Sequence, residues 1–554
     1  MKREMSERAR APFPPAVVIA AALTAFLAAG VLVDRLSYFD DARDTLRGHA
    51  GPAGMPNEGS VGRAVANALE RFGATSTFGG LPEALPSTII MQLEDLGGTL
   101  PVLSIAADED HLNDPQTGIM TNMRATGPEW EKLASVSLWE NGELVVGSRA
   151  GLRIHGDSSR FRGFPSFRLH FRPTYGASRL SGGRLLGPDA APASAVVVHV
   201  VRYEGHYPNI FVFEIARRLG LPTVAFRPAR VYLNGQPRGI YVLTERVMPD
   251  GWGLTYFGDT DFFMYVYKGE TKQRSREAHD ALEEWVRENR PLTMARAAER
   301  IDVPNLTRHL FTLMFCFTTD WAQGASMLDR DDPDARWFWM HWDMDQSFHV
   351  RGSAQLEPWQ QPFFDLILLR EPRDELEQLG IVTDDRHYLR HRDDIRRTIF
   401  SQLLRDTAYR RYFVRFVTDA LNHELTPAFF DGMLARYTSL ERGPGVYSRV
   451  DLGEYLRQRP DFVRSEIANR FNLGSPWVVR VEAPESLAMV IDGFPETGPY
   501  TGVYYRQQTF SVRLAEDAPR RLSHWVVDGE RVDGAQLRLA VTEAHVIRPV
   551  LAAR

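Results

Sequence analysis

The spacing of apolar residues changes along the chain, and each change predicts a different kind of structure. From about residue 98, short apolar runs alternate with polar residues between turn signals, which predicts β-strands. Beyond about residue 275 apolar residues recur every three to four positions, which predicts helices over residues 278–288, 305–319, 385–404, 410–422 and 428–437. After residue 474 the pattern of short strands returns. This order predicts an α+β fold with two lobes over residues 98–474 and a small C-terminal β-sandwich over residues 475–554.

Turn signals define several elements within the first β-rich part. Asn141-Gly142 and Asn234-Gly235 each lie between two short apolar runs, which is a strong pattern for a β-hairpin. Residues 195–201 form a continuous apolar run typical of a buried strand. Residues 207–219 have helical periodicity that stops at Gly220, a residue typical of helix ends.

The N-terminal region contains an uncharged run, residues 16–33, that is about long enough for one helix to cross a bilayer. Basic residues precede this run and acidic residues follow it, so the positive-inside rule places residues 1–15 in the cytoplasm and the bulk of the chain outside it. We therefore predict a transmembrane signal anchor over residues 16–33 and a stalk over residues 34–97. A cleaved secretory signal is the alternative, and it also exports the rest of the chain.

Composition excludes several classes of protein. The chain is 44% hydrophobic and 25% charged, with a formal net charge of -6, so it has the composition of a folded protein and no global basic field for nucleic acid. Its arginines are interleaved with acidic residues, as on a solvated surface. The single cysteine, Cys316, lies in an apolar run and has no partner for an intrachain disulfide or a zinc site.

The pattern with the most chemical content lies in residues 311–348. An apolar helix is predicted to end at Asp320, a polar loop follows, and an aromatic strand over residues 336–342 leads to Asp343 and Asp345. Alternate residues of a strand share a face, which would place the last two carboxylates about 6.6 Å apart. Carboxylates from two segments are suitable ligands for Mg²⁺, and phosphoryl transfer needs one acid for the hydroxyl and another for the metal. A solvent-exposed acidic turn is the alternative.

These residues also carry a resemblance to a known family. WMHWDMDQSF resembles the Trp-Asp-x-Asp-x-Ser-Phe signature of CotH (spore coat protein H) proteins, and VYLNGQPRGIYVLTERV resembles their Asn-Gly hairpin. Three further blocks are similar to that family in the same order: LPVLSIAADEDHLNDPQTGI, GLRIHGDSSRFRGFPSFRLHF and RPDFVRSEIANRFNLG. The resemblance implies an atypical two-lobed kinase-like fold that uses ATP and Mg²⁺ or Mn²⁺ to phosphorylate serine on partner proteins. It also implies a bacterial protein, so the predicted anchor would lie in the inner membrane and the bulk of the chain in the periplasm or at the cell surface.

The resemblance assigns roles to several acidic residues. Asp320 matches the catalytic acid of the family, and Asp343 matches its metal-binding acid. Asp345 lies at a more variable second acidic position, and Glu245 matches the hairpin Glu, which we expect near the nucleotide. Where the family usually carries Asn after the catalytic acid this chain has Ala325, so Gln323 or Ser326 would have to supply that ligand.

Basic residues for a phosphate clamp also depart from the family pattern. Family members usually present one or two lysines in the block after His155, and this chain has none there. The remaining candidates for binding nucleotide phosphates are four arginines and one lysine: Arg153, Arg160, Arg162, Arg168 and Lys268. Arginine binds phosphate through two parallel hydrogen bonds, whereas lysine acts as a point charge. For Lys268 the alternative is a strand-end lysine that extends into solvent.

Two functions remain open at this point. The first is a phosphotransferase that acts on a hydroxyl of a protein or of a cell-envelope polymer, with Asp320, Asp343 and Asp345 in its site. The second is an inactive kinase-like scaffold in cell-envelope or exopolysaccharide assembly, which the missing Asn and lysines favour. Carbohydrate binding by the C-terminal strands is a third possibility and rests on four aromatic residues: Trp477, Tyr500, Tyr504 and Tyr505.

Overall fold

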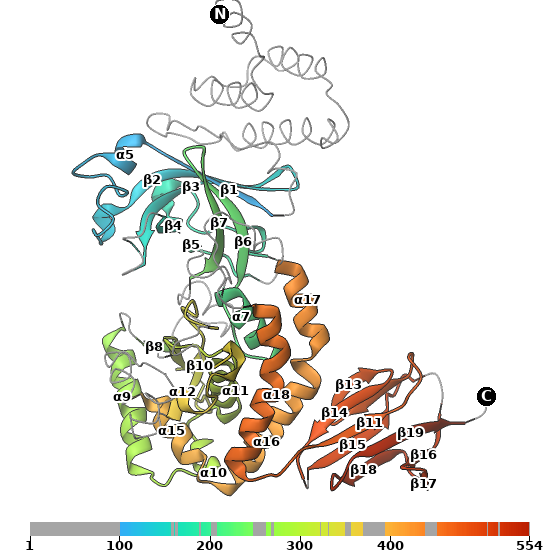
Figure 1. Cartoon of the computed structure of the whole chain (residues 1–554). Coiled ribbons are helices and arrows are strands. Elements are labelled where there is room, and N and C mark those ends of the chain that lie inside the picture. Colours follow the sequence, from blue (N-terminus) through green and yellow to red (C-terminus); the bar gives the residue numbers. More distant parts are fainter. Residues whose placement is uncertain are drawn as a thin grey trace, which may run out of the picture. The chain divides into compact units, whose positions relative to one another are not determined.

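The computed structural model describes residues 100–552, with gaps at 157–159, 161–163, 188–189, 201–207, 247–261, 268–270, 322, 331, 349–355, 369–393, 438–450, 507 and 519–520 (Figure 1). The described residues form two compact units. The first contains the residues up to 202 and 224–260, and the second contains 203–223, 261–442 and 446–554. The predicted anchor and stalk lie outside the described residues. Within the described part of the chain, no helix is long and apolar enough to cross a membrane.

The first unit is built on a closed β-barrel. Its strands are β1 (Val102–Ala107), β2 (Lys132–Glu140), β3 (Glu143–His155), β4 (Ser166–His170), β5 (Ala195–Val200), β6 (Phe226–Leu233) and β7 (Gln236–Glu245), in the order β1-β2-β3-β4-β5-β7-β6. Parallel pairing of β6 with β1 closes the barrel, and the other pairs are antiparallel. Short helical segments connect the strands: α5 (Glu109–Asn113), η2 (Pro128–Trp130), η4 (Pro173–Tyr175) and α6 (Gly182–Leu185). Strands were predicted here, but their closure into a barrel was not.

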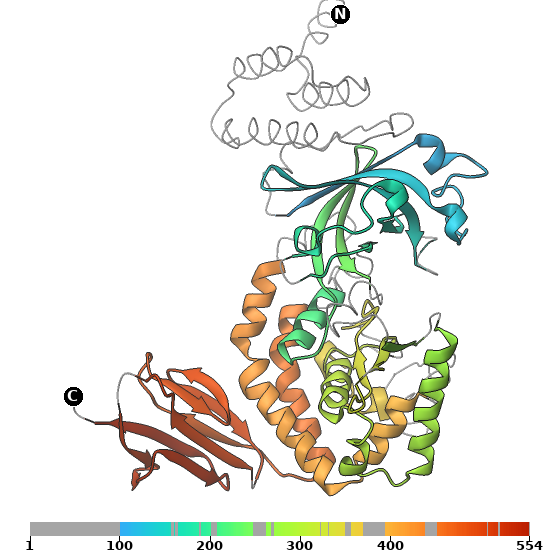
Figure 2. The same cartoon turned by 180° about the vertical axis from the view of Figure 1, so that it is seen from behind.

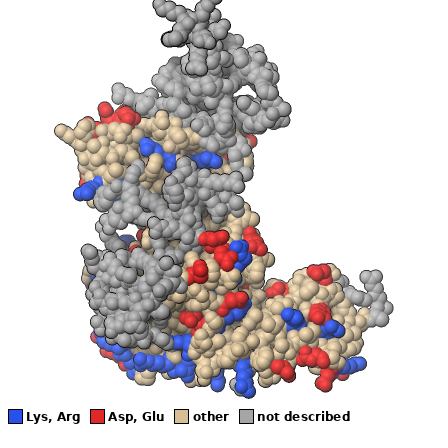
Figure 3. Space-filling model, in the orientation of Figure 1, with Lys and Arg blue, Asp and Glu red and all other residues tan. Residues whose placement is uncertain are grey.

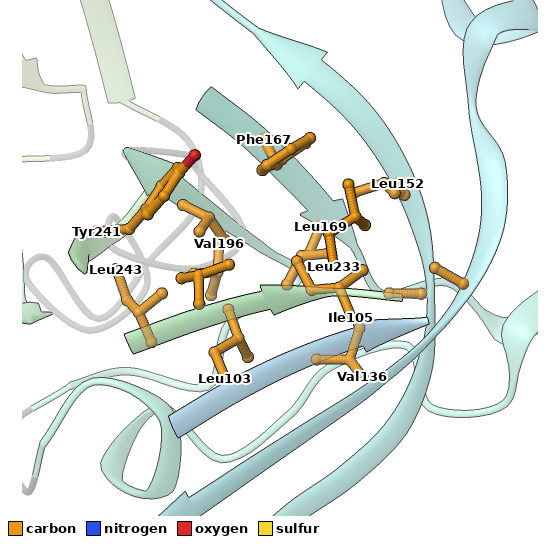
Figure 4. Close-up of a cluster of buried hydrophobic side chains, with 14 of the residues drawn as sticks. Leu103, Ile105, Val136, Leu152, Phe167, Leu169, Val196, Leu233, Tyr241 and Leu243 are labelled. Atoms are coloured by element: carbon orange, nitrogen blue, oxygen red, sulfur yellow. The ribbon is translucent and has the colours of Figure 1, made fainter. Parts of the chain in front are cut away.

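Alternation along the strands places one set of side chains in the barrel core. Figure 4 shows these side chains pointing inward from neighbouring strands; they include Leu103, Ile105, Leu152, Phe167, Leu169, Val196, Tyr241 and Leu243. Each is at most 1% exposed. The intervening residues of β3, β4 and β5 therefore lie on the outer face of the barrel, because successive side chains of a strand point to opposite faces.

The predicted hairpin turns are confirmed. Asn141 and Gly142 have φ angles of 52° and 78°, and Asn234 and Gly235 have 48° and 73°, the left-handed values that a two-residue hairpin turn requires. The side chain of Asn234 also contacts β1, because its Oδ1 accepts from the backbone N–H of Ala107 at 2.8 Å and its Nδ2 donates to the carbonyl of Ala107 at 2.9 Å. One turn residue thus fixes both the hairpin and its neighbour strand.

The second unit combines helices with a small sheet. Its described helices are α7 (Pro208–Arg218), α9 (Gln273–Glu288), α10 (Met294–Ala297), α11 (Val303–Phe315), α12 (Asp365–Leu368), α15 (Ile395–Leu403), α16 (Thr407–Asp419), α17 (Pro427–Tyr437) and α18 (Leu452–Phe471), with 3₁₀-helix η6 (Pro358–Gln360) and π-helix η7 (Ala420–Glu424). Strands β8 (Phe262–Val266), β9 (Ala325–Asp329) and β10 (Phe338–Met340) form a sheet in the order β10-β9-β8. The predicted mixture of helices and sheets is confirmed.

Helix α7 lies between β5 and β6 in the sequence but belongs to the helical unit. Figures 1 and 2 show it beside α17 from both sides. Glu214 of α7 accepts hydrogen bonds from Arg436 at 3.0 Å and from the hydroxyl of Tyr437 at 2.6 Å. The chain therefore leaves the barrel strands, adds one helix to the other unit, and then returns to complete the barrel.

In the region of the acidic residues, the predicted loop and the predicted alternation of Asp343 and Asp345 are wrong, whereas the predicted strand is present with shorter bounds. The segment expected to be a polar loop after Asp320 contains strand β9, which pairs with both β8 and β10. The strand expected over residues 336–342 is shorter, because β10 ends at Met340. Asp343 has a φ of 56°, so the backbone leaves the extended conformation there and the simple alternation expected for Asp343 and Asp345 does not apply.

The C-terminal strands form two sheets around a shared core. One sheet has the order β14-β11-β19-β16-β17 and the other β13-β12-β15-β18. The strands are β11 (Trp477–Val481), β12 (Ala488–Ile491), β13 (Phe494–Thr497), β14 (Tyr500–Tyr504), β15 (Thr509–Leu514), β16 (Leu522–Val527), β17 (Glu530–Val532), β18 (Gln536–Ala540) and β19 (His545–Leu551). This is the predicted β-sandwich arrangement. Figure 3 shows basic and acidic side chains interleaved over these strands.

The aromatic residues considered for carbohydrate binding lie mostly in the interior. Tyr500, Tyr504 and Tyr505 are 7%, 0% and 2% exposed, whereas Trp477 is 38% exposed. The hydroxyl of Tyr504 donates to Asp492 at 2.6 Å, and that of Tyr505 donates to the carbonyl of Arg464 at 2.8 Å. The three tyrosines therefore serve the core of the strands and their junction with the helices, and they do not form a binding platform.

Candidate functional site

Hydrogen bonds join the two segments that carry the predicted acids. The backbone N–H and the hydroxyl of Thr319 donate to the carbonyl of Gln346 at 3.0 and 3.2 Å. Two further hydrogen bonds join the same segments, between Thr318 and Ser347 and between Phe348 and Cys316. Because Asp320 follows Thr319 and Asp345 precedes Gln346, these two acids lie on adjacent stretches of backbone. The structure thus brings together segments that the sequence places 25 residues apart.

The turn that carries Asp343 is anchored by its own buried residue, Met344, and by a hydrogen bond to Asn209. Met344 is 0% exposed, and its backbone N–H donates to Oδ1 of Asn209 on α7 at 2.5 Å. The acids on either side, Asp343 and Asp345, are half-buried. The left-handed φ of Asp343 is an uncommon conformation for a residue other than glycine, and such conformations cluster at functional sites. Asn209 had no sequence signal that linked it to this turn.

Gln323 lies directly beside Asp320. Its side-chain Nε2 donates to Oδ2 of Asp320 at 3.1 Å, and its backbone N–H donates to the carbonyl of Asp320 at 3.1 Å. Ala325 and Ser326 instead begin strand β9 and are both 0% exposed. Gln323 is therefore in place to supply an amide near the acids, as one of the two expected substitutes for the missing Asn, whereas Ser326 is enclosed in the sheet.

Arginines gather on the outer face of the barrel. Arg153 of β3 and Arg168 of β4 are directly paired across the two strands. The pKa of Arg168 is lowered to about 9 by burial and by the positive charges of Arg246, Arg153 and Arg160. Nη2 of Arg168 lies 2.6 Å from Nδ1 of His155, and its Nε is buried without a hydrogen-bond partner among the described residues. A concentration of positive charge with an unused buried donor fits an anionic group such as phosphate.

Three of the arginines proposed from the sequence lie near one another, and a fourth lies with them. Arg153, Arg160 and Arg168 share this face, and Arg246, which follows β7, joins them. Arg160 also holds the nearby backbone, because its Nη1 donates to the carbonyls of Met123 at 3.2 Å and Ala125 at 3.0 Å. The remaining predicted basic residues, Arg162 and Lys268, lie outside the described residues.

Glu245 does not lie with the arginines. Tyr241 and Leu243 of the same strand point into the barrel core, and alternation places Glu245 on that side too. It is 7% exposed, and burial raises its pKa to about 7. Its Oε2 accepts from the N–H of Ala225 at 3.3 Å. Glu245 therefore contacts the segment that leads into β6, and its expected place near the nucleotide stays a prediction.

Buried histidines lie beside the sheet that leads to Asp343, and one of them, His341, directly follows strand β10. His341 is 0% exposed and stacks on His309 with a ring separation of 4.3 Å. Both ring nitrogens of His341 lack a hydrogen-bond partner among the described residues. Burial, and to a smaller extent the charge of Arg396, lowers the pKa of His341 to about 3, and burial also lowers the pKa of His279 to about 4. These histidines are therefore neutral parts of the core at physiological pH.

Replacing His341 with leucine should make the protein less sensitive to acid. The unfolded chain takes up this proton near the ordinary histidine pKa of about 6.5, whereas the folded chain does so only near 3. The free energy of unfolding therefore falls as the pH drops below 6.5, by about 2 kcal/mol between pH 7 and pH 5 for one such group. Urea unfolding at both pH values should show a correspondingly smaller difference for His341→Leu than for the wild type.

His423 provides a control, because its protonation should change the free energy of unfolding in the opposite direction to that of His341. Burial alone would lower its pKa, but hydrogen bonds with Asp492 and Glu496 raise the pKa above its ordinary value. Its contribution to stability is therefore full below pH 6.5 and is lost as the pH rises through the raised value. His423→Gln should make the loss of stability in acid larger, so equal effects of His423→Gln and His341→Leu on the pH dependence would contradict this assignment.

His423 belongs to a buried cluster that the sequence did not suggest. Oxygen and nitrogen atoms of Asp419, His423 and Asp492 lie within 4.8 Å of one another, a spacing compatible with a metal ion. Arg415 already pairs with Asp419 at 2.8 Å and with Asp492 at 3.3 Å, and Nδ1 of His423 lies 2.7 Å from Oε1 of Glu496. Because an arginine already balances both aspartates, we assign the cluster to the junction between η7 and the C-terminal strands.

Comparison with protein families places the chain among kinase-like proteins. The family that matches is described as CotH kinase protein, and the match covers residues 152–470. Because this is more than half of the chain, the chain belongs to the CotH family. The match includes the arginines of the barrel and the segments that carry Asp320 and Asp343, and it begins within β3 and ends within α18. No curated protein matches the chain.

Proposed function

We propose that the chain is an ATP- and metal-dependent phosphotransferase that acts on a hydroxyl of a protein or of a cell-envelope polymer. The observation that carries this proposal is the pair of hydrogen bonds from Thr319 to Gln346, which holds the backbones that carry Asp320 and Asp345 side by side. Membership of a kinase-like family supports nucleotide and metal use. The arginine-rich face of the barrel supports phosphate binding, because the buried Nε of Arg168 has no hydrogen-bond partner among the residues that the structure describes.

Each residue has a distinct task in the proposed reaction. Asp320 would orient the attacking hydroxyl and accept its proton, with its carboxylate steadied by the amide of Gln323. Asp343 and Asp345 would hold Mg²⁺ or Mn²⁺, with Gln323 as a further oxygen ligand, since oxygen ligands suit both ions. When bound, the metal would neutralise charge on the transferring phosphate. Within the barrel unit, Arg153, Arg160, Arg168 and Arg246 would bind an anionic phosphate group.

The proposed setting is the outer side of a bacterial inner membrane. It rests on the uncharged run at residues 16–33 with basic residues before it and acidic residues after it. The partners we propose are a protein or envelope polymer as substrate and the membrane itself through this run. Nucleic acid is not a proposed partner, because the net charge is -6 and the basic residues are interleaved with acidic ones.

The test is stabilisation of the full-length chain by ATP together with Mg²⁺ or Mn²⁺, compared with the Asp343→Ala variant. A ligand present at 100 times its dissociation constant stabilises the folded state by about 2.7 kcal/mol. We expect the wild type to show this metal-dependent increase in melting temperature and the variant to lose it. Transfer of labelled phosphate to the chain or to an added protein then distinguishes catalysis from binding. A well-folded wild type that responds to no nucleotide with either metal would refute the proposal.

An inactive scaffold is the second candidate, and one observation favours it. Ala325 stands where the family usually carries Asn, and it is enclosed at the start of β9 with no atom that binds metal. If this loss inactivates the protein, ATP and metal should bind without any transfer of phosphate. Wild-type protein that binds the nucleotide but transfers no label to any acceptor, including itself, would support the scaffold.

A further inference from the structure

Two fully buried arginines contact the chain on either side of Asp320. Arg459 of α18 donates to the carbonyl of Phe315, at the end of the helix that precedes Asp320. Arg396 of α15 donates through Nη1 to the carbonyl of Gln323, three residues after Asp320, at 3.2 Å. Both arginines are 0% exposed. The segment that carries the proposed catalytic acid is thus attached at both ends to helices that come much later in the chain.

Arg396 is held in one orientation by its own partners. Its Nε and Nη2 donate to the two carboxylate oxygens of Asp394 at 3.0 and 2.6 Å, a bidentate pair. The guanidinium lies over the ring of Tyr267 at 4.0 Å, and the ring of Trp321 lies 5.3 Å away. The side chain of Asp394 is only 5% exposed, so both charges of the pair are removed from water. A guanidinium fixed in this way presents its remaining N–H groups in a set direction.

A short chain of hydrogen bonds connects Arg396 to Asp320. Arg396 fixes the carbonyl of Gln323, and the side chain of Gln323 donates to Oδ2 of Asp320 at 3.1 Å. Gly324 follows this carbonyl, and a Cβ there would lie 2.9 Å from the carbonyl of Met340, which is closer than a Cβ normally approaches. The φ of Gly324 is +123°, a value that side chains rarely adopt. Glycine therefore lets the chain pass close to Met340 directly after the carbonyl that Arg396 contacts.

We propose that Arg396, oriented by Asp394, is a positioning residue that sets the place of the Asp320 carboxylate through Gln323. The inference rests on the proposed function for its effect on the reaction, but its structural part stands on the contacts alone. Arg396 reaches Asp320 through Gln323, so replacing Arg396 should displace the acid without removing it. A displacement of about 1 Å in a reacting group can reduce the rate by roughly 100-fold.

The experiment compares Arg396→Lys with Arg397→Lys in the full-length chain. Lysine keeps the positive charge for Asp394, but a single ammonium cannot reproduce the fork that reaches both Asp394 and Gln323. We expect Arg396→Lys to lower kcat by roughly 10- to 100-fold with the KM for ATP changed less than twofold. Arg397, the next residue of the same helix, donates to the carbonyl of Leu368 and serves as the matched control, with kcat near the wild-type value.

A double-mutant cycle separates positioning from a general loss of stability. If Arg396 acts through Gln323, Arg396→Lys combined with Gln323→Met should lose little more activity than Gln323→Met alone, because the two changes break the same connection. Losses that multiply would overturn the proposal, and a rise in KM equal to the fall in kcat would also overturn it.

Amide hydrogen exchange tests the structural part without any need for activity. Exchange over residues 319–324 should be faster in Arg396→Lys than in Arg397→Lys, since the former loses the contact with Gln323. Equal exchange in the two variants would overturn the positioning role whatever the activity. A wild-type chain that transfers no phosphate, combined with faster exchange in Arg396→Lys, would instead refute the proposed function and retain the structural role.

Discussion

Replacing Asp320 with asparagine is expected to lower the rate of phosphate transfer by roughly 10²- to 10⁴-fold, the range typical for loss of a general base. Asparagine preserves the size of the side chain but cannot accept the proton of the attacking hydroxyl. The partner amide of Gln323 would still lie nearby, so the loop should keep its conformation. Initial rates at saturating ATP and Mg²⁺ measure the effect, and thermal stabilisation by the metal–nucleotide should remain close to the wild-type value.

A matched acidic residue controls for the change of charge. Asp334 lies in the exposed turn before β10, and its backbone N–H donates to Asp332. Asp334→Asn removes the same charge and should leave the rate unchanged. If Asp320→Asn retained the wild-type rate, Asp320 would not be the base. If it abolished nucleotide binding as well as transfer, Asp320 would belong to the metal site.

Replacing Arg459 with methionine is expected to lower the free energy of unfolding by about 3–5 kcal/mol, because four backbone carbonyls would each lose a hydrogen bond from a buried, charged donor. Arg459 is 0% exposed and donates to four backbone carbonyls, those of Met314, Phe315, Trp359 and Gln361. Two of these lie at the end of helix α11, where the carbonyl of Met314 also accepts from the N–H of Phe317 at 3.4 Å and that of Phe315 from the hydroxyl of Tyr455 at 2.6 Å. Methionine fills a similar volume but donates no hydrogen bond. Urea unfolding at pH 7 measures the loss.

Arg457 provides the control on the same helix. Its side chain is 56% exposed and donates to Glu454 at 3.2 Å, an exposed ion pair of the kind that contributes roughly 0.2–1 kcal/mol. Arg457→Met should therefore change the stability by no more than about that amount. Similar losses for the two variants would show that the carbonyl contacts of Arg459 are not responsible for its effect.

Short sequence patterns predicted most individual helices and strands, but they could not predict which distant strands pair with each other. The Asn-Gly turns and helix α7 were predicted correctly because their signals lie within a few residues of one another. The closure of the barrel depends on parallel pairing of Val102 with Arg230, residues that no short pattern connects. Strand β9 was missed because its five residues, Ala325–Asp329, resemble part of a polar loop, and pairing with β8 and β10 on both sides stabilises it.

The sequence drew attention to the acidic residues of the candidate site, but it did not indicate the arginines that lie around it or position it. The order of helix, acid, strand and acids, together with the resemblance to the family, led to Asp320 and Asp343 as candidates, and their roles stay predictions. Arg246 was not found, because it joins Arg168 through the pairing of strands that are distant in the sequence. Arg396 gave no signal at all, since an arginine in an amphipathic helix is normally exposed, and its burial depends on Asp394 and on the loop that it contacts.

The π-helix η7 contributes a residue that covers an edge strand of the C-terminal sheets. Strand β14 is the edge of its sheet, and Asn422 covers that edge like a short piece of neighbouring strand. The Nδ2 of Asn422 donates to the carbonyl of Val503 at 3.0 Å, and its Oδ1 accepts the N–H of Val503 at 3.1 Å. An uncovered edge is a template for pairing with another chain. Residues 475–554 released from the helices by proteolysis would expose this edge and become prone to self-association.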